Sequence, residues 1–379
     1  MTAIYFDNNA STPVCQAATQ AMLDYLNDPA AIGNPTQAHW AGQGAKRYLD
    51  TARSQVASLI NAATDEIVFS SGGTESNNHA LYGCAFKALQ SGSNKRHIIS
   101  SVIEHPATLK PLQDLVELHG FEVSYVEVDA EGFFNLEDIQ SLYREDTLLV
   151  SLMHANNELG SIQPIAEIGA WCRQQGVLFH VDAVCSAGKL DIDVETLQAD
   201  LLSLSAHKFY GPKGVGALYI REAINAEVAH YIHGAGQQRQ RRSGTENVIL
   251  AVGMGVACQQ LQENNQSLRR QQLAQLRDSL YTQLQQTLGE GLLLNGATET
   301  QRRLCNTLNV SFIGHNGQAL LQAIGSQLAF TASKNSSKAV HLLGKGPEAA
   351  LGAVRFSLGS TSTQQDVDRA VQILLSAIK

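Results

Sequence analysis

The chain contains 379 residues, of which 44% are hydrophobic and 16% charged, and its formal net charge is −8. This composition is typical of a globular protein, and the length predicts two or three domains. The negative charge excludes the basic footprint of a protein that binds nucleic acid or anionic membranes. No apolar run approaches the roughly 18 residues that a membrane helix requires. The first residues, Met1–Asp7, do not resemble a secretory signal, and we therefore expect a cytoplasmic location.

Up to about residue 255, short apolar and β-branched runs alternate with amphipathic stretches. Strands are expected over residues 66–69, 97–101, 122–128, 147–153, 177–181, 201–205 and 215–220. Helices are expected between several of these strands, over residues 45–60, 75–89, 106–118 and 165–175. This alternation predicts an α/β fold with a mostly parallel sheet that is covered by helices.

The C-terminal part of the chain has a different pattern. Leucines at helical spacing over residues 260–287 predict a long helix that leaves the first domain. The elements expected after it are strands over residues 307–312 and 352–357 and helices over residues 318–324 and 364–378. We therefore expect a large domain over residues 15–257 and a smaller α+β domain formed by residues 1–14 and 258–379.

The six cysteines are widely spaced, and none belongs to a Cys-x-x-Cys pair. Their spacing indicates neither a zinc site nor a disulfide framework, so we expect no metal site and reduced, mostly buried thiols. These residues are Cys15, Cys84, Cys172, Cys185, Cys258 and Cys305.

The most specific motif follows the expected strand over residues 201–205. Ser205, His207 and Lys208 lead from this strand into a turn that is rich in glycine and proline. A lysine at a strand end, held among apolar residues, can form a Schiff base. A lone lysine in a turn is more often simply solvated, so the interpretation depends on further groups.

Other polar groups follow other expected strands, and ligands of open α/β sheets bind beyond the carboxyl ends of strands. Asp182 could pair with a pyridinium nitrogen, and the turn with Gly73 and Thr74 offers backbone amides to a phosphate. His105, just before a proline-started helix, could stack on a flat cofactor, and Asn157 follows a very apolar strand. A helix cap, a plain turn or a core histidine would explain each group separately. Their joint occurrence favours a pyridoxal 5'-phosphate (PLP) site.

With these motifs together, the sequence resembles the cysteine desulfurases of the class V aminotransferase group, within PLP fold type I. The resemblance runs nearly from end to end and implies PLP as the cofactor. It also implies a mostly parallel sheet covered by helices, with a smaller α+β C-terminal domain. The segments that carry it are Tyr5–Pro13, Gly33–Pro35, Ser70–Glu75, Glu104–His105, Asn156–Glu158, His180–Asp182, Ser205–Lys208, Arg242–Thr245 and Arg355–Gly359.

The resemblance implies a role for each matching residue. Lys208 would hold PLP as an internal aldimine and later move protons at the substrate carbons. Asp182 would bind the pyridine nitrogen, His105 would stack on the ring, and Asn157 would contact the phenolic oxygen. Arg355 would bind the substrate carboxylate, and Asn8 and Asn34 would border the substrate pocket. The residues expected at the phosphate are Gly73, Thr74, Ser205 and His207, joined by Thr245 from a partner subunit. A homodimer with shared active sites follows from this arrangement.

The chain departs from the family pattern at two places. Cys185 stands where the family has a glutamine that donates to the ring oxygen, and a thiol is a weak donor. The segment 328–338 matches the family's mobile loop but contains no cysteine, and Ser336 occupies the position of the sulfur-accepting nucleophile. A serine hydroxyl is scarcely ionised at pH 7 and cannot replace a thiolate as sulfur acceptor. We therefore do not expect the family's persulfide step on this segment.

These features predict a PLP-dependent enzyme of sulfur metabolism that acts on cysteine or a related small amino acid, with a sulfur-acceptor protein as a possible partner. One alternative is a lyase that eliminates a β- or γ-substituent, such as a C–S lyase, or an aminotransferase of the same family. Another is a regulatory or binding protein that retains PLP but has lost turnover. A nicotinamide-dependent dehydrogenase is disfavoured, because the chain lacks the Gly-x-Gly-x-x-Gly motif.

Overall fold

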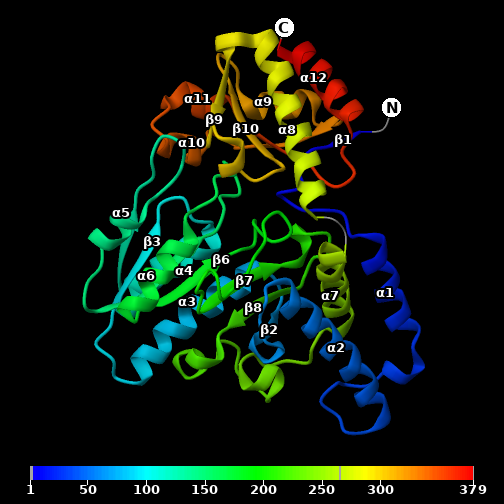
Figure 1. Cartoon of the computed structure of the whole chain (residues 1–379), viewed down its shortest axis with the longest axis vertical. Coiled ribbons are helices and arrows are strands. Elements are labelled where there is room, and N and C mark those ends of the chain that lie inside the picture. The colour runs from blue at the N-terminus through cyan, green and yellow to red at the C-terminus, as the bar shows by residue number, and fades with distance from the viewer. Residues whose placement is uncertain (1–2, 264–265, 379) are drawn as a thin grey trace.

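The large sheet of the computed structural model, which describes residues 3–263 and 266–378, lies below a smaller C-terminal region in Figure 1. Its strand order is β2-β8-β7-β6-β5-β3-β4, and among these strands β8 alone runs against the others. The predicted mostly parallel α/β sheet is therefore confirmed. The strands are β2 (Ile67–Ser70), β3 (His97–Ser101), β4 (Glu122–Val126), β5 (Thr147–Met153), β6 (Leu178–Asp182), β7 (Leu201–Ser205) and β8 (Gly216–Ile220).

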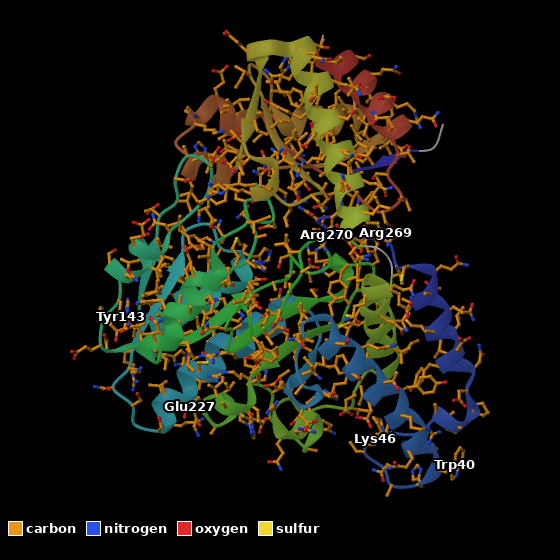
Figure 2. All side chains as sticks on the ribbon, viewed as in Figure 1. Trp40, Lys46, Tyr143, Glu227, Arg269 and Arg270 are labelled. Carbon is orange, nitrogen blue, oxygen red and sulfur yellow. The ribbon has the colours of Figure 1, made fainter. Side chains whose placement is uncertain are left out.

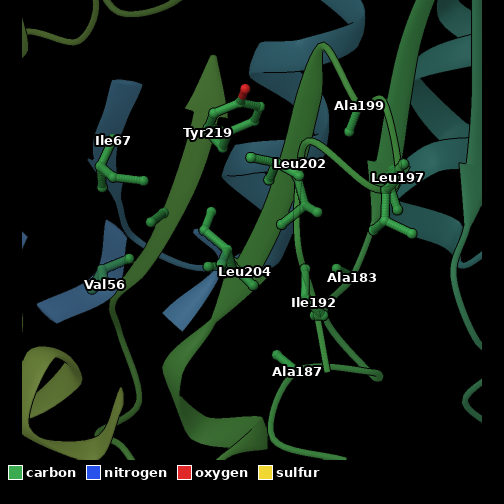
Figure 3. Packing of buried hydrophobic residues seen from close by; sticks show 14 of the residues in the cluster. Val56, Ile67, Ala183, Ala187, Ile192, Leu197, Ala199, Leu202, Leu204 and Tyr219 are labelled. Atoms are coloured by element: carbon green, nitrogen blue, oxygen red, sulfur yellow. The ribbon is translucent and has the colours of Figure 1, made fainter. Parts of the chain in front are cut away.

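Helices cover both faces of this sheet, because the buried strands are apolar on both sides. The helices are α1 (Gln16–Asn27), α2 (Trp40–Leu59), α3 (Gly73–Gln90), α4 (Pro106–His119), α5 (Leu136–Ser141), α6 (Ile165–Gln175) and α7 (Val248–Glu263). One face packs against α2, α6 and α7, with Leu202 and Leu204 of β7 and Tyr219 of β8 in the same core (Figure 3). The opposite face packs against α3 and α4, where Leu201 contributes to a second core.

The C-terminal region contains an antiparallel sheet in the order β12-β13-β10-β9 and a parallel pair, β1 with β11. Ile4 of β1 lies in the hydrophobic core of this region, so the start of the chain packs with its end. The strands are β1 (Ile4–Tyr5), β9 (Leu292–Asn295), β10 (Thr307–Phe312), β11 (Leu328–Ala329), β12 (Thr331–Ala332) and β13 (Ala353–Ser357). The helices are α8 (Gln266–Leu288), α9 (Gly317–Ile324), α10 (Lys338–Leu342), α11 (Gly346–Gly352) and α12 (Gln364–Ile378).

Short 3₁₀ helices connect several of these elements, and the one that follows β7 carries Lys208. They are η1 (Pro29–Ala31), η2 (Thr64–Glu66), η3 (Ala206–Lys208), η4 (Glu222–Glu227), η5 (Gln237–Gln240), η6 (Gly289–Gly291) and η7 (Thr300–Arg302). No helix in the described part of the chain is long and apolar enough to cross a membrane.

The helix predicted over residues 260–287 corresponds to the end of α7 and to α8, and residues 264 and 265 lie outside the described residues. Figure 2 shows Arg269 and Arg270 near the lower end of α8, above the large sheet. Arg270 binds Asp191, which lies between β6 and β7 of the large sheet, with N–O distances of 2.9 Å. We propose the division into residues 15–257 and residues 1–14 plus 258–379 as two domains. The separate cores support it in outline, although Leu261 packs with the large-domain core.

The core around α8 generates a stability prediction. Leu280 is fully buried there, so Leu280→Ala should lower the free energy of unfolding by about 2–5 kcal/mol through lost transfer energy and a residual cavity. Leu118→Ala is the matched control, because Leu118 of α4 is 72% exposed. Urea unfolding of both variants measures the difference. Equal losses would contradict the assigned role of α8 in this core.

Candidate active site

A cavity of about 420 Å³ lies at the carboxyl ends of β5, β6 and β7 and reaches β12 and β13 of the smaller sheet. It brings together most of the site residues predicted from the sequence. The predicted residues that line it are Gly73, Thr74, His105, Asn157, Asp182, Cys185, Ser205, His207, Lys208 and Arg355. The strand-end rule for α/β sheets thus describes the position of the cavity in this protein.

Lys208 reaches the cavity from η3, directly after β7. Its Nζ donates to the backbone carbonyls of Asn9 and Ala10, with a distance of 3.2 Å to the second. The backbone carbonyl of Lys208 accepts from Nζ of the buried Lys189 at 3.3 Å, and Lys189 also donates to the carbonyl of Cys185 at 3.0 Å. Burial lowers the pKa of Lys189. The turn that carries Lys208 is therefore fixed by a buried amine beneath it.

Asp182 ends β6 and is buried at the cavity wall. Its Oδ2 accepts from Nδ2 of Asn77 at 2.6 Å, and its Oδ1 accepts from the backbone N–H of Val184 at 3.0 Å. Asn77 Nδ2 also donates to Thr108 Oγ1 at 3.2 Å. These bonds orient a carboxylate that faces the cavity, where it can hold a cationic ring nitrogen.

The turn before α3 is built for a close approach by an anion. Gly72 has φ +151°, a conformation that favours glycine, and α3 begins at the next residue. A Cβ on Gly73 would lie 2.6 Å from Cγ2 of Val184, so a side chain does not fit there. Backbone amides at a helix N-terminus favour negative charge, and Ser205 and His207 line the same cavity.

His105 is the N-cap of α4, and its Nδ1 accepts from the backbone N–H of Ala107 at 3.0 Å. This bond fixes the ring orientation and places the proton of the neutral ring on Nε2. Burial lowers the pKa of His105, and it lowers the pKa of His207 to about 4. Both rings are therefore favoured in their neutral form.

Arg355 lies on β13, where its side chain is 7% exposed and ion-paired with Asp7. Its Nη2 donates to Asp7 Oδ1 at 2.8 Å and to Thr331 Oγ1 at 2.7 Å, and its Nη1 donates to the carbonyl of Asn157 at 3.0 Å. The Nε atom is buried without a hydrogen-bond partner. A guanidinium with a free donor thus faces the cavity that contains Lys208.

Four predicted residues do not line this cavity. Asn8 donates to the carbonyl of Ser357 at 3.0 Å and lines a neighbouring cavity. Asn34 precedes α2, whose first residue Trp40 lies at the lower end of the molecule in Figure 2. Thr245 is exposed. Ser336 Oγ is 3.0 Å from Nε2 of His341, outside the cavity.

Three polar side chains that line the cavity are not predicted by the sequence analysis. Asn9, beside the predicted Asn8, donates to Thr307 Oγ1 at 2.8 Å and lines the cavity. Asn77 lies one helical turn after Gly73 and shares its face, a spacing that could have identified it. No local motif marks Thr331, because its position opposite Arg355 follows from the pairing of β12 with β13.

A buried carboxyl group lies next to the site. Glu104 Oε1 accepts from Ser101 Oγ at 2.6 Å and from the backbone N–H of Met153 at 3.0 Å, whereas its Oε2 is buried without a partner. Burial raises the pKa of Glu104 from 4.5 to about 8, and the charge of Asp182 adds to this effect. Glu104 is therefore favoured as the neutral acid at pH 7.

A family model described as aminotransferase class-V matches residues 4–370. The chain is 40% identical to the cysteine desulfurase IscS of Clostridium botulinum strain Hall over 385 residues, which cover 99% of this chain and 94% of that protein. It is 41% identical to the cysteine desulfurase IscS of Shewanella amazonensis over 382 residues, with 99% and 92% covered.

Solved structures agree with this relationship. A NifS-like protein superimposes with a TM-score of 0.91 at 36% identity and covers 99% of both chains. A structure described as SspA in complex with cysteine gives a TM-score of 0.79 at 33% identity, with 96% of this chain and 100% of that chain covered. The fold is that of PLP fold type I. The chain belongs to the cysteine desulfurase family of the class V aminotransferases.

The raised pKa of Glu104 predicts a pH-dependent stability. The folded protein keeps this proton up to about pH 8, whereas the unfolded chain releases it near pH 4.5. The stability contributed by the proton is therefore complete below pH 4.5, falls progressively as the pH rises above 4.5, and is lost once the pH has passed 8. Glu104→Gln imitates the neutral acid, so wild type should lose about 2 kcal/mol more than the variant between pH 6 and pH 8. Urea unfolding at both pH values measures this difference, and parallel losses would contradict it.

Proposed function

We propose that the protein is a PLP-dependent enzyme that acts on cysteine or a related small amino acid, with Lys208 bound covalently to the cofactor. The observation that carries the proposal is one cavity that contains Lys208, Asp182, His105, Arg355 and the turn at Gly73. A protein that serves only as an interaction surface does not need this set of groups. The names of its relatives, cysteine desulfurases, support the same class of enzyme.

The chemistry of the cavity fits PLP. The turn at Gly73 leaves no room for a Cβ, as a phosphate cradle requires, and Asp182 is a buried acid oriented by Asn77. Asn77 Oδ1 and Arg355 Nε are buried polar atoms without partners at the cavity, so polar ligand groups would satisfy them. When bound, PLP supplies an electron sink for charge that develops at the substrate carbons.

The residues of the chain would perform the binding and proton transfers. Asp182 would hold a proton on the pyridine nitrogen, and the His105 ring would pack against the cofactor. Asn157 would contact the phenolic oxygen, with Cys185 as a weak donor. Lys208 would hold the cofactor, and its amine would move a proton at the substrate Cα. Arg355 holds the substrate carboxylate, for which its fork geometry is suited.

A homodimer would complete the phosphate site. We propose that Thr245 of one subunit reaches the phosphate site of the other, since it is exposed and lies outside the cavity of its own chain. The neighbouring Arg242 is anchored to Glu75 of α3 by bonds of 2.8 and 3.2 Å, which fixes the direction of this segment. Asn8 and Asn34 at the substrate pocket, a sulfur-acceptor partner and a cytoplasmic location remain predictions.

A second candidate function is elimination, favoured by the absence of a thiol in the segment 328–338. A C–S lyase breaks the Cβ–S bond of cysteine and releases sulfide, and its remaining product hydrolyses to pyruvate and ammonia. A desulfurase instead transfers the sulfur atom to a thiol and forms alanine. Cys185 is the cysteine that lines the cavity, on the side of the ring acid. Transamination, and a PLP-retaining protein without turnover, are the remaining alternatives.

Lys208→Ala tests the cofactor assignment. The variant should lose the visible absorbance of the lysine-bound cofactor and should no longer be labelled by borohydride reduction, because no other amine replaces Nζ at this position. Lys46→Ala is the control, because Lys46 on α2 is 48% exposed and lies outside the cavity. Absorbance and mass spectrometry of the reduced protein check the result. An unchanged visible band in Lys208→Ala would show that the cofactor attachment is misassigned.

Treatment with cysteine tests the sulfur chemistry. We expect no persulfide on residues 328–338, because a persulfide requires a protein sulfur atom and this segment has none. Mass spectrometry after thiol trapping, with parallel assays of sulfide, alanine and pyruvate, distinguishes the two reactions. Sulfide with pyruvate identifies elimination, and alanine that requires an added thiol identifies desulfuration by an external acceptor. Sulfane sulfur on Cys185, absent in Cys185→Ala, would contradict our expectation for this residue.

A further inference from the structure

The hydrogen bonds of Arg355 already engage the nitrogen that a second carboxylate would need. A guanidinium has five N–H donors, one on Nε and two on each Nη. Nη2 donates to two acceptors, Asp7 Oδ1 at 2.8 Å and Thr331 Oγ1 at 2.7 Å. Nη1 donates to the carbonyl of Asn157 at 3.0 Å, and Nε has no partner although it is buried. Nη2 is therefore the most heavily engaged nitrogen of the group.

A bidentate carboxylate accepts two parallel N–H bonds from one edge of the guanidinium. The two available edges pair Nη2 with either Nε or Nη1, so each edge includes an N–H of Nη2. In this structure Nη2 already has two acceptors, one of them a carboxylate. A substrate carboxylate that binds in the bidentate manner consequently competes with Asp7 and Thr331 for Nη2.

Asp7 is the acceptor that chemically resembles the incoming group. Asp7 follows β1 and forms a β-bridge with Ser357 of β13, two residues after Arg355. Thr331 of β12 pairs directly with Arg355 of β13. Thr331 Oγ1 donates to Asp7 Oδ1 at 2.6 Å. If Asp7 leaves Nη2, it retains this partner and its 20% exposure to water. Displacement therefore does not leave a buried carboxylate without a donor.

We propose that Asp7 is a resident competitor of the substrate carboxylate and sets the affinity of the site for amino acids. The inference rests on the proposed role of Arg355 as the carboxylate-binding residue. In the free protein, Asp7 neutralises a nearly buried guanidinium. In the complex, the substrate carboxylate takes its place on Nη2 and also reaches an N–H beside it. Asp7 thus weakens the binding of ligands that carry a carboxylate and leaves simple amines unaffected.

Titration of the PLP-loaded protein with two ligands tests the proposal. L-alanine carries the carboxylate, and ethylamine is the same molecule without it. In Asp7→Asn, the dissociation constant of L-alanine should fall about tenfold, as expected when a charge-assisted hydrogen bond no longer competes. The dissociation constant of ethylamine should stay within about twofold, because an amine alone does not need Arg355. Visible absorbance and calorimetry provide two readouts that do not depend on turnover.

Control variants separate the possible outcomes. Asp191→Asn removes an exposed Asp–Arg pair, with Arg270, outside the cavity and should leave both affinities unchanged. Arg355→Ala should raise the dissociation constant of L-alanine by roughly a hundredfold and leave that of ethylamine unchanged. Thr331→Val removes one acceptor of Nη2 and the hydroxyl that donates to Asp7. Like Asp7→Asn, it should therefore strengthen the binding of L-alanine. This variant keeps the side-chain shape and serves as the test if Asp7→Asn does not fold.

Weaker or unchanged L-alanine binding in Asp7→Asn, with ethylamine unchanged, would overturn the proposal, since Asp7 would then only position Arg355 or not affect it. Equal L-alanine affinity in wild type and Arg355→Ala would remove Arg355 from the carboxylate site and the proposal with it. Failure of the PLP assignment itself is visible earlier. In that case the wild-type protein, before any ligand is added, lacks the absorbance band that Lys208→Ala abolishes.

Discussion

The parallel register of β3, β5, β6 and β7 is the constraint on which the site depends. Met153 of β5 lies opposite Asp182 of β6, and Asp182 lies opposite Ser203 of β7. This register brings the strand ends to one edge, where the chain presents His105, Asp182 and Lys208 to a single cavity. Successive side chains of a strand face opposite sides, so a slip by one residue would turn Asp182 away from the cavity. The buried apolar strands that prevent such a slip are therefore as necessary to the chemistry as the polar residues.

The N-terminal segment connects this edge with the smaller sheet. Thr12 donates from its backbone to the carbonyl of His207 at 2.8 Å and accepts from the backbone N–H of Tyr210 at 2.7 Å. Asn9 reaches Thr307 of β10 at 2.8 Å, and its carbonyl accepts from Lys208. One short segment thus holds the lysine turn against the region that carries Arg355. The positions of Lys208 and Arg355 therefore depend on the same contacts.

The sequence predicts the long elements well, because β5 and β7 are buried on both faces and follow the expected boundaries. The strands β9, β11 and β12 are too short to show a period, and pairing with distant strands creates them. The same distinction holds in the site. Polar residues at strand ends could be recognised locally, whereas the bond of Asn77 to Asp182 joins residues 105 positions apart. The bond of Arg355 to Asp7 spans 348 positions, and no local pattern marks it.

The fold holds the residues around Arg355 differently from the segment that carries Ser336. Arg355 and Thr331 are held opposite one another by antiparallel register, and Asp7 is tied to the same strand by its bridge to Ser357. The segment that follows Thr331 carries Ser336 and leads into α10 without forming part of a sheet. Connecting segments tolerate substitutions that a paired strand does not. A serine at position 336 therefore leaves the strand pairing around Arg355 intact.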